Sequence, residues 1–143
     1  MRSKLGSEAL KREVAALRCG LDEAAWNAST CLDLTGQVRT DADRRKRTPL
    51  PFDAARAHRL YAVLLGEVAD LIAGKHLLVV ASGALTQLPL QVLVTEPPEP
   101  GGSHAIAWLA RAHAVSVLPA ATSLRALRRV GRPSAASKPL LGI

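Results

Sequence analysis

The stretch His76-Leu77-Leu78-Val79-Val80-Ala81 decides the fold class of this 143-residue chain. It is apolar at every position after the histidine, and Gly74 and Gly83 bound it. Such a run is typical of a strand that is buried on both faces, as in the middle of a parallel sheet. We therefore expect a central strand here. We also expect Leu78→Asp to prevent folding, because it would bury an unpaired charge.

Two helices and a linker are expected before this strand. Residues 5–25 place Leu10, Val14, Leu17 and Leu21 at helical spacing, which predicts a helix with one buried stripe. Residues 26–51 lack periodicity and contain the basic run Arg44-Arg45-Lys46-Arg47 before two prolines, which predicts a loop or linker. A second helix should start at Asp53, a good N-cap, and end at Gly74. Its expected apolar face comprises Tyr61, Leu64, Leu65, Val68 and Leu71 or Ile72.

Turns, short helices and further strands are expected after the central strand. We first predict a turn at 82–85, a kinked apolar plug at Leu88-Pro89-Leu90, a strand or short helix at 91–94 and a surface loop at 95–103. A helical turn at 108–110 and a strand at 113–118 should follow. The last predicted elements are a helix at 124–130 with Ser123 as N-cap, a polar linker at 131–137 and a strand at 138–143. This alternation predicts an α/β fold. Because the sequence stops inside the last predicted strand, we expect the fold to be truncated at its C-terminus.

Composition narrows the class of protein. Hydrophobic residues make up 48% of the chain and aromatic residues only 3%, so the core must be aliphatic and base-stacking surfaces are scarce. The formal charge of +7 favours acidic partners, but it does not define a function. We expect no nucleic-acid partner, no membrane span and no cofactor. Residues 1–25 lack the apolar segment of a signal peptide, which predicts a cytoplasmic location.

The ordered set of motifs resembles the first half of a CHAT domain. The resemblance rests on Phe52-Asp53 with the helix that follows, Lys75 to Val80, Ser82-Gly83-Ala84-Leu85, Leu88-Pro89-Leu90, Trp108-Leu109, His113, Pro119 with Ser123-Leu124, and Pro139-Leu140-Leu141-Gly142. CHAT domains are caspase-like modules that are often found behind tetratricopeptide repeats, especially in bacteria. Residues 52–143 would form the partial CHAT domain, and residues 1–51 an N-terminal helix and basic linker.

The resemblance implies a caspase-like α/β sandwich with a mostly parallel central sheet and cysteine-peptidase chemistry. In that family a His at the end of one strand activates a Cys at the end of a later strand, and the thiolate attacks a peptide carbonyl. The His-Gly and Ala-Cys turns of the family have no match in this sequence, so no catalytic residue is assigned. The sequence also has Ala81-Ser82 where the family commonly has Pro-Asp.

The cysteines and histidines give little sign of a site. Cys19 lies near the apolar stripe of the first helix, which predicts a packed structural thiol, and the two cysteines do not form a disulfide framework. Cys31 has no histidine nearby in sequence, and His58 is kept as an alternative partner that the fold would have to bring close. His113 is expected at the edge of the core. His76 and His104 are likewise weak candidates for catalysis, and the spacing of these residues gives no zinc motif.

The remaining motifs have ordinary structural interpretations. Ser82-Gly83 lacks the Gly-x-Ser-x-Gly elbow and predicts a plain turn, and Gly101-Gly102 lacks the residues of a phosphate loop. The residues Arg125, Arg128, Arg129 and Arg132 share one helical face, which is expected to be solvated unless phosphates or an acidic protein surface meet it.

The sequence thus predicts the N-terminal part of a CHAT-type cysteine-peptidase fold that is inactive alone. Its expected partner is a protein, either the remaining CHAT segment or another chain that pairs with the open edge of the sheet. The two alternatives are an interaction module of this second kind and a non-functional gene fragment.

Overall fold

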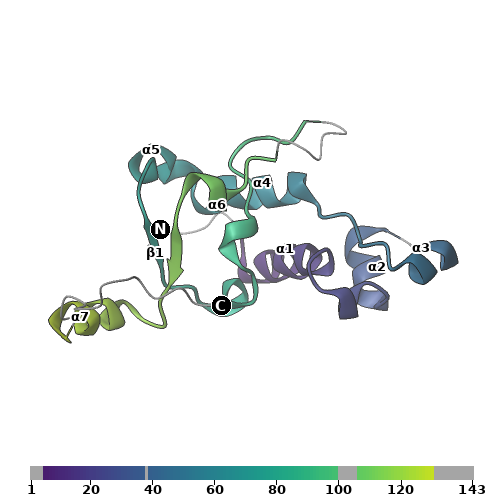
Figure 1. Ribbon diagram of the computed structural model, residues 1–143, viewed down its shortest axis with the longest axis horizontal. Coiled ribbons are helices and arrows are strands. Elements are labelled where there is room, and N and C mark those ends of the chain that lie inside the picture. Colours follow the sequence, from purple (N-terminus) through teal and green to yellow (C-terminus); the bar gives the residue numbers. More distant parts are fainter. Residues whose placement is uncertain (1–4, 38, 100–105, 131–143) are drawn as a thin grey trace, which may run out of the picture.

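The computed structural model describes residues 5–37, 39–99 and 106–130, which form a helix-rich α/β structure with a small parallel sheet (Figure 1). The α-helices are α1 (Ser7–Cys19), α2 (Ser29–Thr35), α3 (Asp41–Lys46), α4 (Ala54–Leu64), α5 (Ala69–Ile72), α6 (Leu109–Ala112) and α7 (Ala121–Val130). The short 3-10 helices are η1 (Glu23–Ala25), η2 (Gly66–Val68), η3 (Gly83–Gln87) and η4 (Leu90–Val92). The strands are β1 (Leu77–Val79) and β2 (Val115–Val117).

The first helix follows the predicted apolar stripe. Val14 and Leu17 of α1 are buried in the main core, and Leu10 packs at its border. The helix ends at Gly20, where an added Cβ would lie 3.1 Å from Cα of Phe52. Leu21 is exposed, so the prediction that the buried stripe includes it is wrong, because the helix has ended before that position.

The prediction of a loop or linker at residues 26–51 is wrong, because this segment contains two helices. α2 ends at Gly36, whose φ of +67° is the left-handed conformation that glycine adopts readily. α3 starts with a capping box, in which the hydroxyl group of Thr40 accepts from the backbone N–H of Asp43 while the Asp43 carboxylate accepts from the backbone N–H of Thr40. This reciprocal cap allows a short helix to form in a strongly charged sequence.

The second predicted helix starts where expected but is interrupted. The Asp53 side chain accepts from the backbone N–H of Arg56, as predicted for an N-cap. α4 ends at Leu65, and the chain continues through η2 and α5 to Gly74. The single apolar face that was predicted from Tyr61 to Leu71 or Ile72 is therefore wrong in part: Tyr61 is buried, whereas Leu71 is exposed.

The main core lies where α1, α4 and the segment around η4 and α6 meet. Its central side chains are aliphatic, as the scarcity of aromatic residues predicts. The core comprises Val14, Leu17, Ala57, Leu60, Tyr61, Leu88, Leu90, Leu93, Val94 and Leu109. Leu88 and Leu90 are thus the buried plug that was expected. At 91–94, where a strand or a short helix was expected, the short helix η4 covers the first two residues and Val94 forms an isolated bridge to Trp108.

The two strands confirm a parallel pairing, but they correct the prediction of a strand buried on both faces. Leu77 pairs with Val115, and Val79 pairs with Val117, in parallel register. Leu77, Val79 and Val115 pack against the core, while Leu78 retains 43% of its exposed area. Among the described residues β1 has one neighbouring strand, and the side chains that alternate away from the core, Leu78 and Val80, are exposed.

The last described elements follow the predicted order but differ in some bounds. β2 lies within the strand predicted at 113–118, whereas α6 overlaps the helical turn predicted at 108–110 and continues to Ala112. α7 begins at Ala121, so Ser123 lies inside the helix and the prediction that it is the N-cap is wrong. The predicted linker at 131–137 and strand at 138–143 lie outside the described residues, as do residues 100–103 of the predicted loop at 95–103.

Candidate functional site

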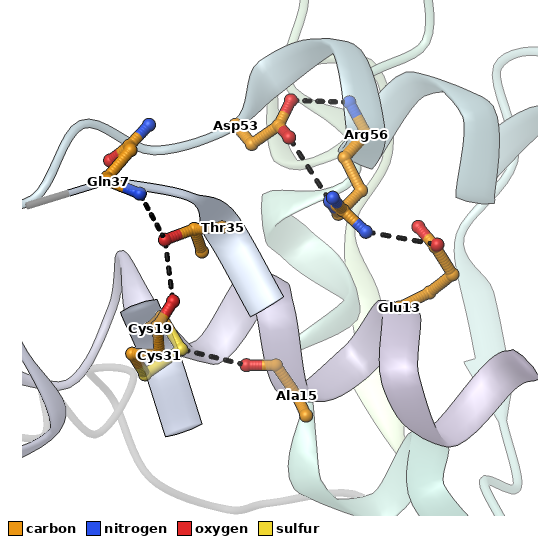
Figure 2. A network of polar contacts seen from close by, with 8 residues as sticks. All are labelled: Glu13, Ala15, Cys19, Cys31, Thr35, Gln37, Asp53 and Arg56. Carbon is orange, nitrogen blue, oxygen red and sulfur yellow. Dashed lines mark hydrogen bonds and ion pairs between the residues drawn. A yellow bond between two sulfur atoms is a disulfide. The ribbon is translucent and has the colours of Figure 1, made fainter. Parts of the chain in front are cut away.

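The two cysteines form a disulfide bond, which corrects the prediction of a packed free thiol. The packing of α2 against α1 brings the two Cα atoms to 5.6 Å, a normal separation for a bridged pair. Both side chains are buried, as predicted for Cys19, and Sγ of Cys19 also lies 3.3 Å from the carbonyl oxygen of Ala15. Figure 2 shows the bridge between the helices, next to the hydroxyl group of Thr35, which donates to the carbonyl oxygen of Cys31.

The sequence alone does not predict this disulfide bond. Two cysteines twelve positions apart do not specify a pairing, because their distance depends on the turn between them. That turn becomes compact through η1, whose N-cap Asp22 accepts from the backbone N–H of Ala24. Since both sulfur atoms are bonded, neither is a thiolate nucleophile in this structure.

The described histidines are held by groups other than cysteine. Nδ1 of His58 donates to the carbonyl oxygen of Val94 at 3.1 Å, so His58 is not the partner of Cys31. Nδ1 of His113 donates to the carbonyl oxygen of Lys75 at 3.0 Å, and the ring is buried, which confirms its place at the core. Nε2 of His76 shares a hydrogen bond with the hydroxyl group of Ser116. His104 lies outside the described residues.

The Ser82-Gly83 segment forms a turn, as predicted. Ser82 is exposed and extended, and Gly83 opens η3 with a φ of +57°. The hydroxyl group of Thr86 donates back to the carbonyl oxygen of Gly83, which closes the turn. Within the described ranges no group of three or more His, Cys, Asp or Glu side chains has the arrangement of a metal site.

Two of the four residues in the first basic run form ion pairs with acidic neighbours. Arg44 forms an ion pair with Asp41 at 3.2 Å, and Arg47 forms one with Glu23. Glu23 lies on η1 inside the loop that the disulfide closes, so the second pair joins this loop to the end of α3. A hollow of about 420 Å³ lies beside this segment. It is lined by Gln37, Arg39, Asp43, Thr48, Pro49, Leu50 and Pro51.

Arg39, which lines this hollow, also contacts the ring of Trp26. The guanidinium group of Arg39 lies over the Trp26 ring, 4.9 Å from its centroid, and donates to the side chain of Asn27 and to the carbonyl oxygen of Asp43. Nε of Arg39 and Nε1 of Trp26 are buried without a partner. The hydroxyl group and backbone N–H of Thr40 lower the pKa of the Asp43 carboxyl below its ordinary value, since both donate to the ionised form.

The second basic cluster is different, because the part of the chain that the structure describes gives it no acidic partner. Arg125, Arg128 and Arg129 are exposed on α7, and no ion pair with a described residue involves them. Arg132 lies outside the described residues. The helix that carries the three arginines, α7, lies beyond the carboxyl end of β2, away from α1 and α4 (Figure 1).

A few exposed apolar side chains lie on and beside the sheet, where sequence reasoning expected complete burial. Leu78 follows the alternation of β1 away from the core, and Val80 and Val117 retain 46% and 58% of their exposed area.

The described residues contain no helix of the length and apolar character that a membrane span requires. No family model, curated protein or solved structure matches this chain.

Proposed function

We propose that this chain supplies the front part of a CHAT-type, caspase-like module, and that another polypeptide segment completes its sheet. The observation that carries the proposal is the parallel pair of β1 and β2, joined by a connection through η3, η4 and α6. Parallel strands with such a connection are the building unit of α/β sheets. A sheet of two strands has edges at which a further strand can pair.

The proposal assigns the chemistry to the segment that is added. In the family, the catalytic His and Cys follow later strands, and this chain contributes the scaffold that holds them. The bonded state of Cys19 and Cys31 and the hydrogen bonds of His58 and His113 support this division, because these side chains already have structural roles. The chain alone is therefore expected to have no peptidase activity.

A chimaeric protein tests this function. The chain would be joined to the segment of a bacterial CHAT protein that carries its His-Gly and Ala-Cys turns. A fluorescent epoxide probe for reactive cysteines should label the chimaera and neither part alone, because the thiolate forms only beside its histidine. A chimaera with alanine in place of the added cysteine is the control. Two independent unfolding transitions, one for each part, would show that the parts do not share a sheet.

The proposal includes a cytoplasmic location, and the state of the two cysteines in the cell tests it. Disulfides persist mainly in oxidising compartments, so a cytoplasmic chain should carry Cys19 and Cys31 as buried thiols and form the bond after exposure to air. Rapid alkylation of intact cells, followed by mass spectrometry, separates the two cases. Two alkylated cysteines agree with the cytoplasm, whereas a protected pair favours an oxidising compartment.

A further inference from the structure

The side of the sheet that faces away from the core carries apolar side chains. Leu77 and Val79 point toward the core, so the alternation of the strand directs Leu78 and then Val80 to the opposite side. The register of the strands places Ser116 beside Leu78 on this open face. The hydrogen bond between Ser116 and His76 holds the polar side chains of the face together at one end. Parallel sheets normally carry helices on both faces, so an uncovered face of this kind is unusual.

A basic helix, α7, follows β2 in the chain. Three residues separate the end of β2 from the start of α7, which extends beyond the carboxyl end of that strand (Figure 1). Arg125, Arg128 and Arg129 are spaced so that they share one side of the helix. The sequence contains no acidic residue after Glu99, so the segments next to α7 in the sequence supply no Asp or Glu side chain that could pair with these arginines. Val80, on the same side of β1 as Leu78, lies at the same end of the sheet as the start of α7.

We infer that the open sheet face and the arginines of α7 together form a docking surface for an acidic amphipathic helix of a partner protein. The apolar side of that helix would cover Leu78 and Val80, as helices cover parallel sheets. Its acidic side chains would pair with the arginines, and Arg binds carboxylates particularly well because its donors match their geometry. The inference goes beyond the proposed function, since it concerns the face of the sheet and not the edge at which strands are added.

Two other anionic partners fit the observations less well. Nucleic acid would use the arginines, but it has no need of an apolar sheet face, and aromatic side chains for base stacking are scarce. An anionic bilayer would also attract the arginines, but membrane-surface helices bury large apolar residues of their own. The apolar residues that are exposed here belong to strands, which another protein layer covers in α/β folds.

A labelled peptide provides the direct test. The probe is a helical peptide of about 18 residues, or five turns, with leucines along one side and glutamates beside them. A matched peptide carries lysine in place of each glutamate. Fluorescence anisotropy with the full chain, at low and at high salt, measures binding. We expect the acidic peptide to bind about tenfold more tightly than its lysine counterpart and to weaken at high salt.

Three variants locate the surface. Arg128→Glu should weaken binding of the acidic peptide by about tenfold, while Arg45→Glu, the same change on the exposed side of α3, should change it by less than about twofold. Leu78→Ser should weaken binding by about fivefold with an unchanged helical circular dichroism spectrum. Equal effects of the two arginine variants would overturn the inference, as would equal binding of the two peptides. Tighter binding to a DNA duplex or to phosphatidylserine vesicles would also overturn it and would identify the other partner. Failure of the chimaera described above would leave this result unaffected.

Discussion

The burial of a single leucine decides the cost of its removal in this chain. Leu93 is fully buried in the main core, whereas Leu78 retains 43% of its exposed area on β1. We predict that Leu93→Ala lowers the free energy of unfolding by about 2 to 5 kcal/mol, because it leaves a cavity among packed side chains. Leu78→Ala should lower it by less than about 1 kcal/mol. Urea unfolding followed by circular dichroism measures both.

The exposure of Leu78 also changes the expected result of Leu78→Asp. The sequence predicted that this change would prevent folding, since consecutive apolar residues indicate a strand that is buried on both sides. A carboxylate at this position reaches water in the structure, so the isolated chain should still fold. A Leu78→Ala variant as unstable as Leu93→Ala would contradict this reasoning and would show that the face is covered in solution.

Gly20 tests the packing at one backbone position. A Cβ atom there would lie 3.1 Å from Cα and 3.3 Å from Cδ2 of Phe52, closer than most such contacts. We predict that Gly20→Ala costs about 1 kcal/mol of unfolding free energy, because the segment at Phe52 must shift. Gly66→Ala is the control, since its nearest neighbour would lie 3.9 Å away. Equal midpoints of urea unfolding for the two variants would contradict the prediction.

At the scale of the element, the capping box of α3 depends on the charge of Asp43. Hydrogen bonds from Thr40 lower the pKa of this carboxyl in the folded state. The folded chain therefore binds that proton less readily than the unfolded chain, and the stabilisation of α3 is complete above the ordinary pKa of about 4. It should be lost as the pH falls below 4 through the lowered pKa.

An NMR titration of the Asp43 carboxyl carbon checks this behaviour. Thr40→Val removes the hydroxyl donor, so the titration midpoint of Asp43 should move up toward its ordinary value. Thr30→Val, on the exposed side of α2, should leave the midpoint unchanged. An unchanged midpoint in Thr40→Val would show that the box is open in solution.

The same elements show how far sequence reasoning reaches. The Asp53 cap, the α1 stripe and the strand at Leu77 were predicted because local propensity and periodicity determine them. α2 and α3 were missed, although Thr40 and Asp43 have the spacing of a capping box, because the basic run and nearby prolines favoured a loop. The exposure of β1 could not be predicted, since it depends on which elements cover the sheet and not on the strand itself.

At the scale of the whole molecule, the buried residues form two separate clusters. The main core joins α1, α4 and the segment around η4, whereas Cys19, Cys31 and Leu50 form a smaller cluster with Trp26 and Leu34 at its border. The two cysteines belong to the smaller cluster. The sequence could not have shown this division, because the disulfide that holds the smaller cluster depends on the packing of α2 against α1.

The last prediction concerns the independence of the two clusters. A reducing agent should open the Cys19–Cys31 bond and remove about 3 kcal/mol of stabilisation, since the closed loop is about a dozen residues long. The ion pair between Arg47 and Glu23 and the bond from Arg39 to Asn27 both lie within the segment from η1 to α3, so they do not hold it to the main core. Amide hydrogen exchange should therefore become faster in α2 and α3 after reduction, while α4 and β1 keep their protection. The double variant Cys19→Ala with Cys31→Ala should show the same exchange with and without reductant. Loss of protection in α4 together with α2 would contradict the prediction, because it would mean that the two clusters unfold as one cooperative unit.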